Sequence, residues 1–276
     1  MAAKTTIVVP HLGGIKAGYR LSGDAVDPSK PTVVLVNSMC TTSSLFDAQF
    51  SSKALTDAVN LLAIEPLGHG ATSSPSEHFT YWDSAVMSLQ VLEALGIDKA
   101  FALGTSQGGW IVVRMALLAP EKILGVLPLG TSMDYESSES REKGCWDPKT
   151  SLRPFYDSWD SATPTPDFVV DEVWRGLVSS VGFGTNPSAE TLSFWDETLK
   201  QVYSGDEGRR SSEPPSPISS SVMACCFAFV MSSALSTGFR APRTPCSARM
   251  SLLSTSSSLS QAPRLHSPLW MVPATT

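Results

Sequence analysis

Short and almost wholly apolar runs recur along the first half of the chain. Thr32 to Val36 is rich in β-branched residues, and similar runs cover Leu61 to Ile64, Ala100 to Leu103 and Ile123 to Leu129. A strand that is buried on both faces has this pattern, because neither of its sides meets water. The four runs therefore predict the central strands of a sheet that is covered on both faces.

Two segments before these runs alternate apolar and polar residues instead. They are Thr5 to Pro10 and Ile15 to Leu21, and they lie on either side of Gly13-Gly14. A period of two around a glycine pair is typical of an antiparallel hairpin. We expect this hairpin at the edge of the sheet.

Apolar residues at spacings of three and four fill segments between the strands. Tyr81 to Leu95 carries such a stripe and is followed by Gly96, as a helix C-terminus commonly is. Gln107 to Leu118 has the same pattern and ends before Pro120. Strands that alternate with helices of this length imply crossover connections and a mostly parallel sheet with helices on both faces. The predicted fold class is α/β.

The pattern changes again from Tyr135 to Tyr203, where short helical segments are rich in aromatic residues and interrupted by prolines. This region resembles a helical cap. Aromatic side chains above a sheet would form an apolar pocket, although aromatics at helical spacing also occur as plain core. We divide the chain into a core at residues 1–134, a helical cap at 135–203 and a remnant of the core at 204–276.

The amino-acid composition restricts the classes of binding partner. The chain has 276 residues, 42% of them hydrophobic, which is enough for one sizeable core. Its formal net charge of −6 and its lack of any Lys/Arg run argue against nucleic acid and anionic membranes. The N-terminus has no secretory h-region, and Val222 to Leu235 is shorter than the ~20 residues of a membrane span. We therefore expect an intracellular protein without a membrane span.

The cysteines indicate neither a disulfide framework nor a metal site. There are five, an odd number, and none has CxxC spacing. We expect free thiols, no metal and no cofactor.

The candidate nucleophile lies in Gly104-Thr105-Ser106-Gln107-Gly108-Gly109. Ser106 follows an apolar strand and precedes an amphipathic helix, which is the sharp turn of a G-x-S-x-G motif. Gly104 and Gly108 let the backbone pass closely on either side. The N–H of Gln107, at the start of the helix, would point toward a substrate oxygen. We predict Ser106 as the nucleophile and Gln107 as one half of an oxyanion hole.

These motifs resemble those of the α/β-hydrolase superfamily. That family usually has His-Gly-x after the first buried strand. This chain has Asn37-Ser38-Met39-Cys40-Thr41 there, with Met39 at position x. The resemblance implies that the Met39 N–H is the second oxyanion donor. Glu65 to Ser73 looks like the family's D-x-x-G-x-G-x-S stretch, with Glu in place of Asp. His69 belongs to that stretch and is interpreted as structural. We expect His11 and His78 to be solvated.

Within the superfamily, about residues 15 to 205 resemble the hydrolases of fungal gene clusters that make epoxy-decatrienoic-acid host-selective toxins, the AK-, AF- and ACT-toxins. The resemblance implies secondary metabolism and a small-molecule acyl or polyketide-derived substrate. Members of that group can be peroxisomal. The C-terminus Ala274-Thr275-Thr276 is not an S-K-L-type address, so the cytoplasm is the alternative.

The acid and the histidine that the family places after the nucleophile are missing from their expected positions. Ser211 to Thr276 holds 17 Ser and 8 Pro but no Asp, Lys, Asn or Tyr, and Glu213 is its one acid. This composition is not typical of a packed α/β half. His266 and Asp134 are the alternatives for the base and the acid.

Such an abrupt change after Arg209-Arg210 is typical of a shift in reading frame. Reverse translation in the alternative frame turns Val230 to Thr244 into DVKCPVYWLQGTED, a strand that ends in an acidic loop. Leu265 to Thr276 becomes LTFVDGAGHY, a strand followed by a histidine. Trp270 and Met271 have single codons, which force the Asp-Gly of VDG. We hypothesise that the tail from about Ser211 is out of frame.

Three kinds of function stay open. The first is serine-dependent hydrolysis or acyl transfer at an ester, thioester or lactone. The second is a catalytically inactive, frameshifted paralogue that acts, if at all, as a binding protein. The third comprises other reactions on the same fold, either a cofactor-free haloperoxidase-like activity or the epoxide hydrolases and dehalogenases, which use Asp where this chain has Ser106.

Overall fold

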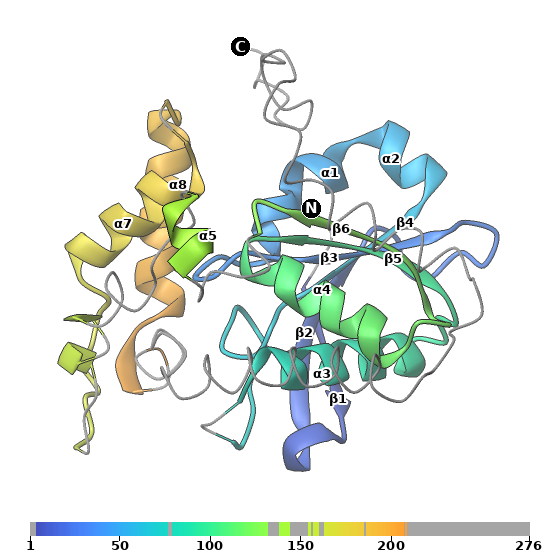
Figure 1. Ribbon diagram of the computed structural model, residues 1–276, viewed down its shortest axis with the longest axis horizontal. Helices are drawn as coiled ribbons and strands as arrows, with labels where there is room; N and C mark the ends of the chain where they lie inside the picture. The colour runs from blue at the N-terminus through green and yellow to red at the C-terminus, as the bar shows by residue number, and fades with distance from the viewer. Residues whose placement is uncertain are drawn as a thin grey trace. The chain divides into compact units, whose positions relative to one another are not determined.

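The computed structural model describes residues 4–76, 79–131, 138–143, 154–155, 157–159, 163–184, 186–206 and 208. In this part of the chain, six strands form one sheet with the order β1-β2-β4-β3-β5-β6 (Figure 1). The strands are β1 (Thr5–Val9), β2 (Ile15–Leu21), β3 (Thr32–Val36), β4 (Asn60–Ile64), β5 (Ala100–Thr105) and β6 (Ile123–Leu129). The β1-β2 and β2-β4 pairs are antiparallel, and the pairs from β4 to β6 are parallel. The predicted α/β class is confirmed.

Two of the helices connect strands where the sequence predicts them. The described helices are α1 (Asp47–Ser51), α2 (Lys53–Ala58), α3 (Tyr81–Ala94), α4 (Gln107–Leu118), α5 (Ser138–Glu142), α7 (Glu172–Gly182) and α8 (Ala189–Val202), with 3-10 turns η1 (His11–Gly13) and η2 (Ser43–Phe46). The two predicted connections are α3 and α4. Gly96 follows α3 with a positive φ of 68°, which glycine adopts without strain. The predicted N-terminal hairpin is confirmed, with β1 at one edge of the sheet.

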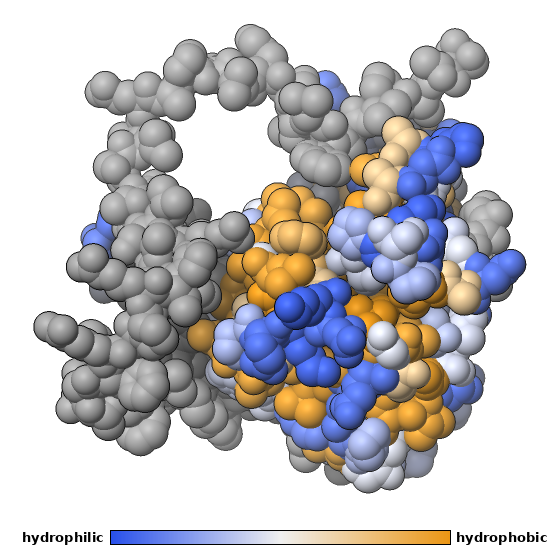
Figure 2. Space-filling view, turned by 90° about the vertical axis from the view of Figure 1, so that its right-hand side faces the viewer, coloured by the Kyte–Doolittle hydropathy of each residue, from blue (hydrophilic) through white to orange (hydrophobic). Residues whose placement is uncertain are grey.

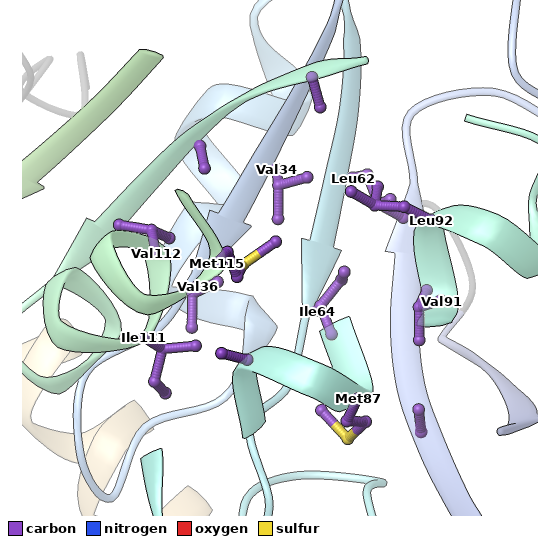
Figure 3. Packing of buried hydrophobic residues seen from close by; sticks show 14 of the residues in the cluster. Val34, Val36, Leu62, Ile64, Met87, Val91, Leu92, Ile111, Val112 and Met115 are labelled. Carbon is purple, nitrogen blue, oxygen red and sulfur yellow. The ribbon is translucent and has the colours of Figure 1, made fainter. Parts of the chain in front are cut away.

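Alternate side chains of the central strands pack against different helix layers. Val34 and Val36 of β3 face the layer of α3 and α4, where they join Ile111 and Met115 in the largest apolar cluster (Figure 3). Leu35, between them in sequence, belongs to a second cluster with Phe46. In Figure 1, α1 and α2 lie on the opposite side of the sheet from α3 and α4. Burial on both faces explains why these strands are almost wholly apolar.

The start of α3 ties the hairpin to the sheet, and it shows one prediction to be wrong. Thr80 and Asp83 form a capping box, in which each side chain bonds to the other residue's backbone N–H. Asp83 also accepts from His11 Nε2 at 2.8 Å, and the His11 N–H donates to Gln90. His11 is therefore half-buried and paired, rather than solvated as expected. His78 lies outside the described residues.

An aromatic cluster joins α7 and α8 to the loop after β3. Asp171 caps α7 and Ser188 caps α8, each through its side-chain oxygen. The buried members of the cluster are Cys40, Trp159, Val170, Trp174, Leu199 and Tyr203, and Met39 packs against them. The described helices of the predicted cap thus contact the loop that is predicted to hold the oxyanion.

A helix that spans a membrane needs both sufficient length and sufficient hydropathy. None of the described helices is both long and apolar enough to cross a bilayer. The face in Figure 2 shows hydrophilic and hydrophobic patches side by side, as folded proteins commonly do, because apolar atoms make up much of their surface.

Candidate active site

Ser106 has the backbone of a strained strand-to-helix turn. It lies between β5 and α4 with φ 51° and ψ −116°, and it is exposed. Its N–H donates to the Leu129 carbonyl at 2.8 Å, and its own carbonyl accepts from the Gly109 N–H at 3.0 Å and from Thr131 Oγ1 at 2.8 Å. Such a conformation costs a non-glycine residue about 1–3 kcal/mol and persists only where its surroundings hold it. The sharp turn that the sequence predicts between strand and helix is therefore present at Ser106, and its role as the nucleophile stays a prediction.

Gly104 and Gly108 allow this turn to form. A Cβ on Gly104 would lie 2.1 Å from the Gly108 carbonyl, so strand and helix meet almost backbone to backbone. A Cβ on Gly108 would lie 2.1 Å from the Val36 carbonyl oxygen. The two glycines thus bring the start of α4 directly against the end of β3, which is where the predicted oxyanion loop begins.

The loop after β3 is closed by its own polar side chains. The Asn37 amide donates to the carbonyls of Ser38 at 3.1 Å and Thr41 at 2.8 Å, and the Thr41 N–H donates back to the Ser38 carbonyl. Ser38 Oγ donates to Thr105 Oγ1 at 2.8 Å, which fastens the loop to β5. Asn37-Ser38 departs from His-Gly, yet it builds a tight loop through these bonds. Cys40 has φ 60° within it.

The two predicted oxyanion donors border this junction. Met39 is half-buried in the loop, and Gln107 is the first residue of α4. Within the described ranges, the N–H groups of Met39 and Gln107 donate to no other residue. Backbone N–H groups at a helix start are suited to a developing negative charge.

Cys40 is the buried thiol beside them. Burial raises the pKa of the Cys40 thiol to about 12, so the thiol stays protonated and is not a second nucleophile. It is free, as predicted. The remaining four cysteines lie outside the described residues.

Glu65, at the end of β4, anchors the segments around the loop. Its Oε1 accepts from the Ser43 N–H and Oγ, each at 2.8 Å, and from Lys4 Nζ at 3.0 Å. Its Oε2 accepts from the Ala71 N–H at 2.6 Å. Burial by itself would raise the pKa of the Glu65 carboxyl. The charge of Lys4 and the N–H groups of Ala71 and Ser43 outweigh burial, so the pKa lies below its ordinary value.

Space for this longer carboxylate comes from missing side chains. A Cβ on Gly70 would lie 2.0 Å from Glu65 Oε2, and one on Gly18 would lie 2.9 Å from it. Glu is therefore accommodated where the family pattern has Asp.

His69 is buried in the turn that follows Glu65. Its Nδ1 lies 2.9 Å from the Leu67 carbonyl, and its Nε2 lies 3.0 Å from the Cys40 nitrogen and 2.9 Å from Gln107 Nε2. Burial lowers the pKa of His69, against the opposing effects of the Leu67 carbonyl and Glu65. Both ring nitrogens are engaged, which agrees with the structural interpretation. Sequence reasoning missed that its partners flank the oxyanion site.

Neither described histidine is hydrogen-bonded to Ser106. His11 bonds to Asp83 and His69 to the groups named above, and the Ser106 hydroxyl makes no hydrogen bond within the described ranges. Asp134, His266 and the tail from Ser211 lie outside them. Among the described side chains, His, Cys, Asp and Glu form no group of three that could hold a metal ion.

Comparison with known proteins agrees with this geometry. A family profile described as the alpha/beta hydrolase fold matches residues 31–167. The chain has the α/β-hydrolase fold. The matched segment, which includes the predicted oxyanion loop and Ser106, is similar to that family.

Individual relatives are distant. A 2-heptyl-3-hydroxy-4-quinolone dioxygenase of Rhodococcus erythropolis is 27% identical over 111 residues, which are 39% of this chain and 39% of the relative. A probable hydrolytic enzyme of Pseudomonas aeruginosa superposes with a TM-score of 0.57 at 16% identity, over 76% of this chain and 64% of that one. An epoxide hydrolase of Mycobacterium thermoresistibile gives 0.52 at 17% identity, over 76% and 74%. The chain thus spans about two fifths of the dioxygenase and just under two thirds of the hydrolytic enzyme.

Substitution of Gly108 by Ala tests the close approach of α4 to β3. The new Cβ would meet the Val36 carbonyl, which is rigid backbone, so we expect a loss of about 1–3 kcal/mol in the free energy of unfolding. Urea unfolding measures it. Gly176→Ala is the matched control, because Gly176 is exposed in α7 with no atom near its Cβ position, and it should gain up to about 1 kcal/mol. Equal effects at both positions would contradict the close approach.

Replacement of Glu65 by Gln tests the anchor. The amide keeps one acceptor oxygen but places N–H groups against Lys4 or Ala71. We therefore expect a loss of about 1.5–3 kcal/mol in the free energy of unfolding. The pKa of the Glu65 carboxyl is lower in the folded state than its ordinary value of 4.5. The difference in stability between the parent and Glu65→Gln should therefore be complete above pH 4.5 and vanish as the pH falls through the pKa of the folded state. The same change at the exposed Glu93 should alter stability by less than about 0.5 kcal/mol at any pH.

Proposed function

We propose that this chain descends from a serine-dependent hydrolase that cleaves or transfers the acyl group of an ester, thioester or lactone. The observation that carries the proposal is the strained, exposed Ser106 between β5 and α4. A strained conformation at a serine is typical of a functional site, and a nucleophile has to stand clear of the backbone at this point. The tight glycine contacts on both sides support the same interpretation.

In the proposed reaction, Ser106 Oγ attacks the acyl carbon and its proton passes to a general base. The carbonyl oxygen becomes an oxyanion, which the N–H groups of Met39 and Gln107 stabilise. Collapse of the tetrahedral intermediate expels the alcohol or thiol, which takes up the proton, and leaves an acyl-serine. Water or a second acceptor then releases the acyl group by the same steps.

We place the acid and base of that reaction in the alternative reading frame of the tail. β6 is the last strand of the described sheet, and its Leu127 and Leu129 are 43% and 38% exposed. Two further strands, such as the alternative frame encodes, would cover these side chains. The acid would follow the first of them and the histidine the second, in the order of the family.

For the substrate, we propose a small apolar acyl or polyketide-derived molecule. Met39 packs against an apolar cluster that includes Trp174 of α7 and Leu199 of α8, so the side of the predicted oxyanion loop that meets these helices is apolar. A role in fungal secondary metabolism, in the manner of toxin-cluster hydrolases, follows from the sequence resemblance. From the same resemblance we propose a peroxisomal location, or a cytoplasmic one if no targeting signal is present.

A second candidate is a catalytically inactive relative that binds ligands without turning them over. It is favoured by the engagement of both described histidines elsewhere, His11 with Asp83 and His69 with Cys40. An epoxide-hydrolase reaction is less well supported, because it needs Asp where this chain has Ser106. The quinolone dioxygenase, a distant relative, is named for a different reaction.

A fluorophosphonate probe separates the two candidates. An activated serine reacts with it covalently, so the full chain should be labelled at Ser106, and Ser106→Ala should abolish the labelling. Ser180→Ala, on the exposed side of α7, is the matched control and should label as the parent does. A chain that is folded but unlabelled would favour the inactive relative.

Sequencing of the coding DNA across Arg209 tests the frame shift. We expect that correcting the frame there yields a chain whose labelling rate exceeds that of the present one by about 10² or more, because a general base typically contributes 10²–10⁴. Its thermal unfolding should also become a single cooperative transition. Equal labelling rates of the two chains would contradict the hypothesis that the present chain lacks its general base.

A further inference from the structure

We propose that His69 is a positioning residue that holds the two halves of the oxyanion hole together, a proposal that rests on the hydrolase function above. The sequence places His69 in a turn motif far from Ser106. In the structure its Nε2 contacts Cys40, the neighbour of Met39, and the side chain of Gln107. These are the two segments whose N–H groups are the candidate oxyanion donors.

The backbone dictates the tautomer of the ring. The Leu67 carbonyl can only accept, so Nδ1 at 2.9 Å from it has to carry the proton. The Cys40 N–H can only donate, so Nε2 at 3.0 Å has to present its lone pair. Two opposite backbone groups thus select the neutral Nδ1–H form.

That tautomer also orients Gln107. A lone pair on Nε2 attracts an amide N–H and repels an amide oxygen, which agrees with Gln107 Nε2 at 2.9 Å from the ring. The loop after β3 and the first residue of α4 therefore share the single lone pair of this nitrogen. Cys40 is held at φ 60°, a conformation that costs free energy, so its N–H bond to His69 helps to keep the loop in place.

The surroundings keep the ring fixed and uncharged. The Tyr203 ring, directly after α8, meets the His69 ring edge-on with centroids 6.2 Å apart. The titratable groups around His69 are the carboxylate of Glu65, which is paired with Lys4, and the neutral Cys40 and Tyr203. Burial outweighs the attraction of Glu65, so the pKa of His69 lies below its ordinary value.

Protonation would remove the function we propose for the ring. A proton on Nε2 replaces the lone pair by a donor, so both the Cys40 N–H and the Gln107 amide would have to turn away. The folded state resists this protonation and the unfolded state does not. Stability that depends on neutral His69 is therefore lost as the pH falls below 6.5, the ordinary value.

Two variants separate the acceptor from the rest of the ring. His69→Gln can place its amide oxygen near the position of Nε2, whereas His69→Leu fills similar space without an acceptor. The control is His11→Gln, at the other described histidine, which lies in the hairpin and pairs with Asp83. All are made in the full chain and compared by three measurements.

The first two measurements need no activity. Nitrogen-15 NMR of the parent should show His69 as the Nδ1–H tautomer, and hydrogen exchange should show a protected Cys40 amide. In His69→Leu that amide should exchange at least about tenfold faster, and in His69→Gln close to the parental rate. An Nε2–H tautomer in the parent overturns the proposal even if the variants do not fold. So does an unchanged Cys40 exchange rate in folded His69→Leu.

The third measurement is the rate of fluorophosphonate labelling against pH. His69→Leu should lower the rate by about 10–10², less than the 10²–10³ expected for deletion of an oxyanion donor. His69→Gln should recover most of it and lose the parental fall in rate at acid pH. His11→Gln should keep both the rate and the fall. If His69→Gln does not restore the labelling rate, the proposal is overturned. If the parent protein is never labelled, only the hydrolase function is overturned, and the first two measurements decide on the role of His69.

Discussion

The close approach of α4 to the end of β3 is the constraint on which the site depends. Because Gly108 has no side chain, the first turn of the helix lies against the Val36 carbonyl, and the loop that begins at Asn37 meets Gln107. The same turn forces Ser106 into its positive φ. The strain is balanced from β6, since the Leu129 carbonyl and the Thr131 hydroxyl bond to the Ser106 backbone. Three parallel strands thus determine the position of one hydroxyl group.

A second set of contacts holds the loop from the opposite side. Glu65 bonds to Ser43 beyond the loop and to Ala71 in the turn, and His69 in that turn reaches back to Cys40. The carboxylate is largely buried, but its charge is balanced by Lys4 and by backbone N–H groups. A buried charge with complete hydrogen bonding fixes its partners more strictly than apolar packing does. The loop therefore gets its shape from the polar turn after β4 and its apolar surroundings from α7 and α8.

The sequence predicts the strands and helices well because their signals are local. Val33 to Val36 is apolar at every position since both faces of the strand are covered, and Thr80 and Asp83 mark the start of α3 within four residues. The elbow is predictable for the same reason, because strand, glycine, serine and helix are adjacent in sequence. His11 was misjudged because its partner Asp83 is 72 residues away. The bond of His69 to Cys40 spans 29 residues and joins two loops, and no periodicity reports such a contact.

In this fold, the nucleophile and oxyanion donors of a serine hydrolase come from earlier parts of the chain than its acid and base. The first group could therefore persist without the second. The elbow, the oxyanion donors and their supports all lie between Lys4 and Thr131, and the bonds described above connect them to one another. The family's acid and base come from later strands, so a change of frame near Arg209 leaves the first set intact. A preorganised oxyanion hole binds tetrahedral and anionic groups even when nothing activates the serine, because its donors are backbone N–H groups. If Met39 and Gln107 form the proposed oxyanion hole, binding would therefore be separable from turnover, and it would depend on the residues between Lys4 and Thr131.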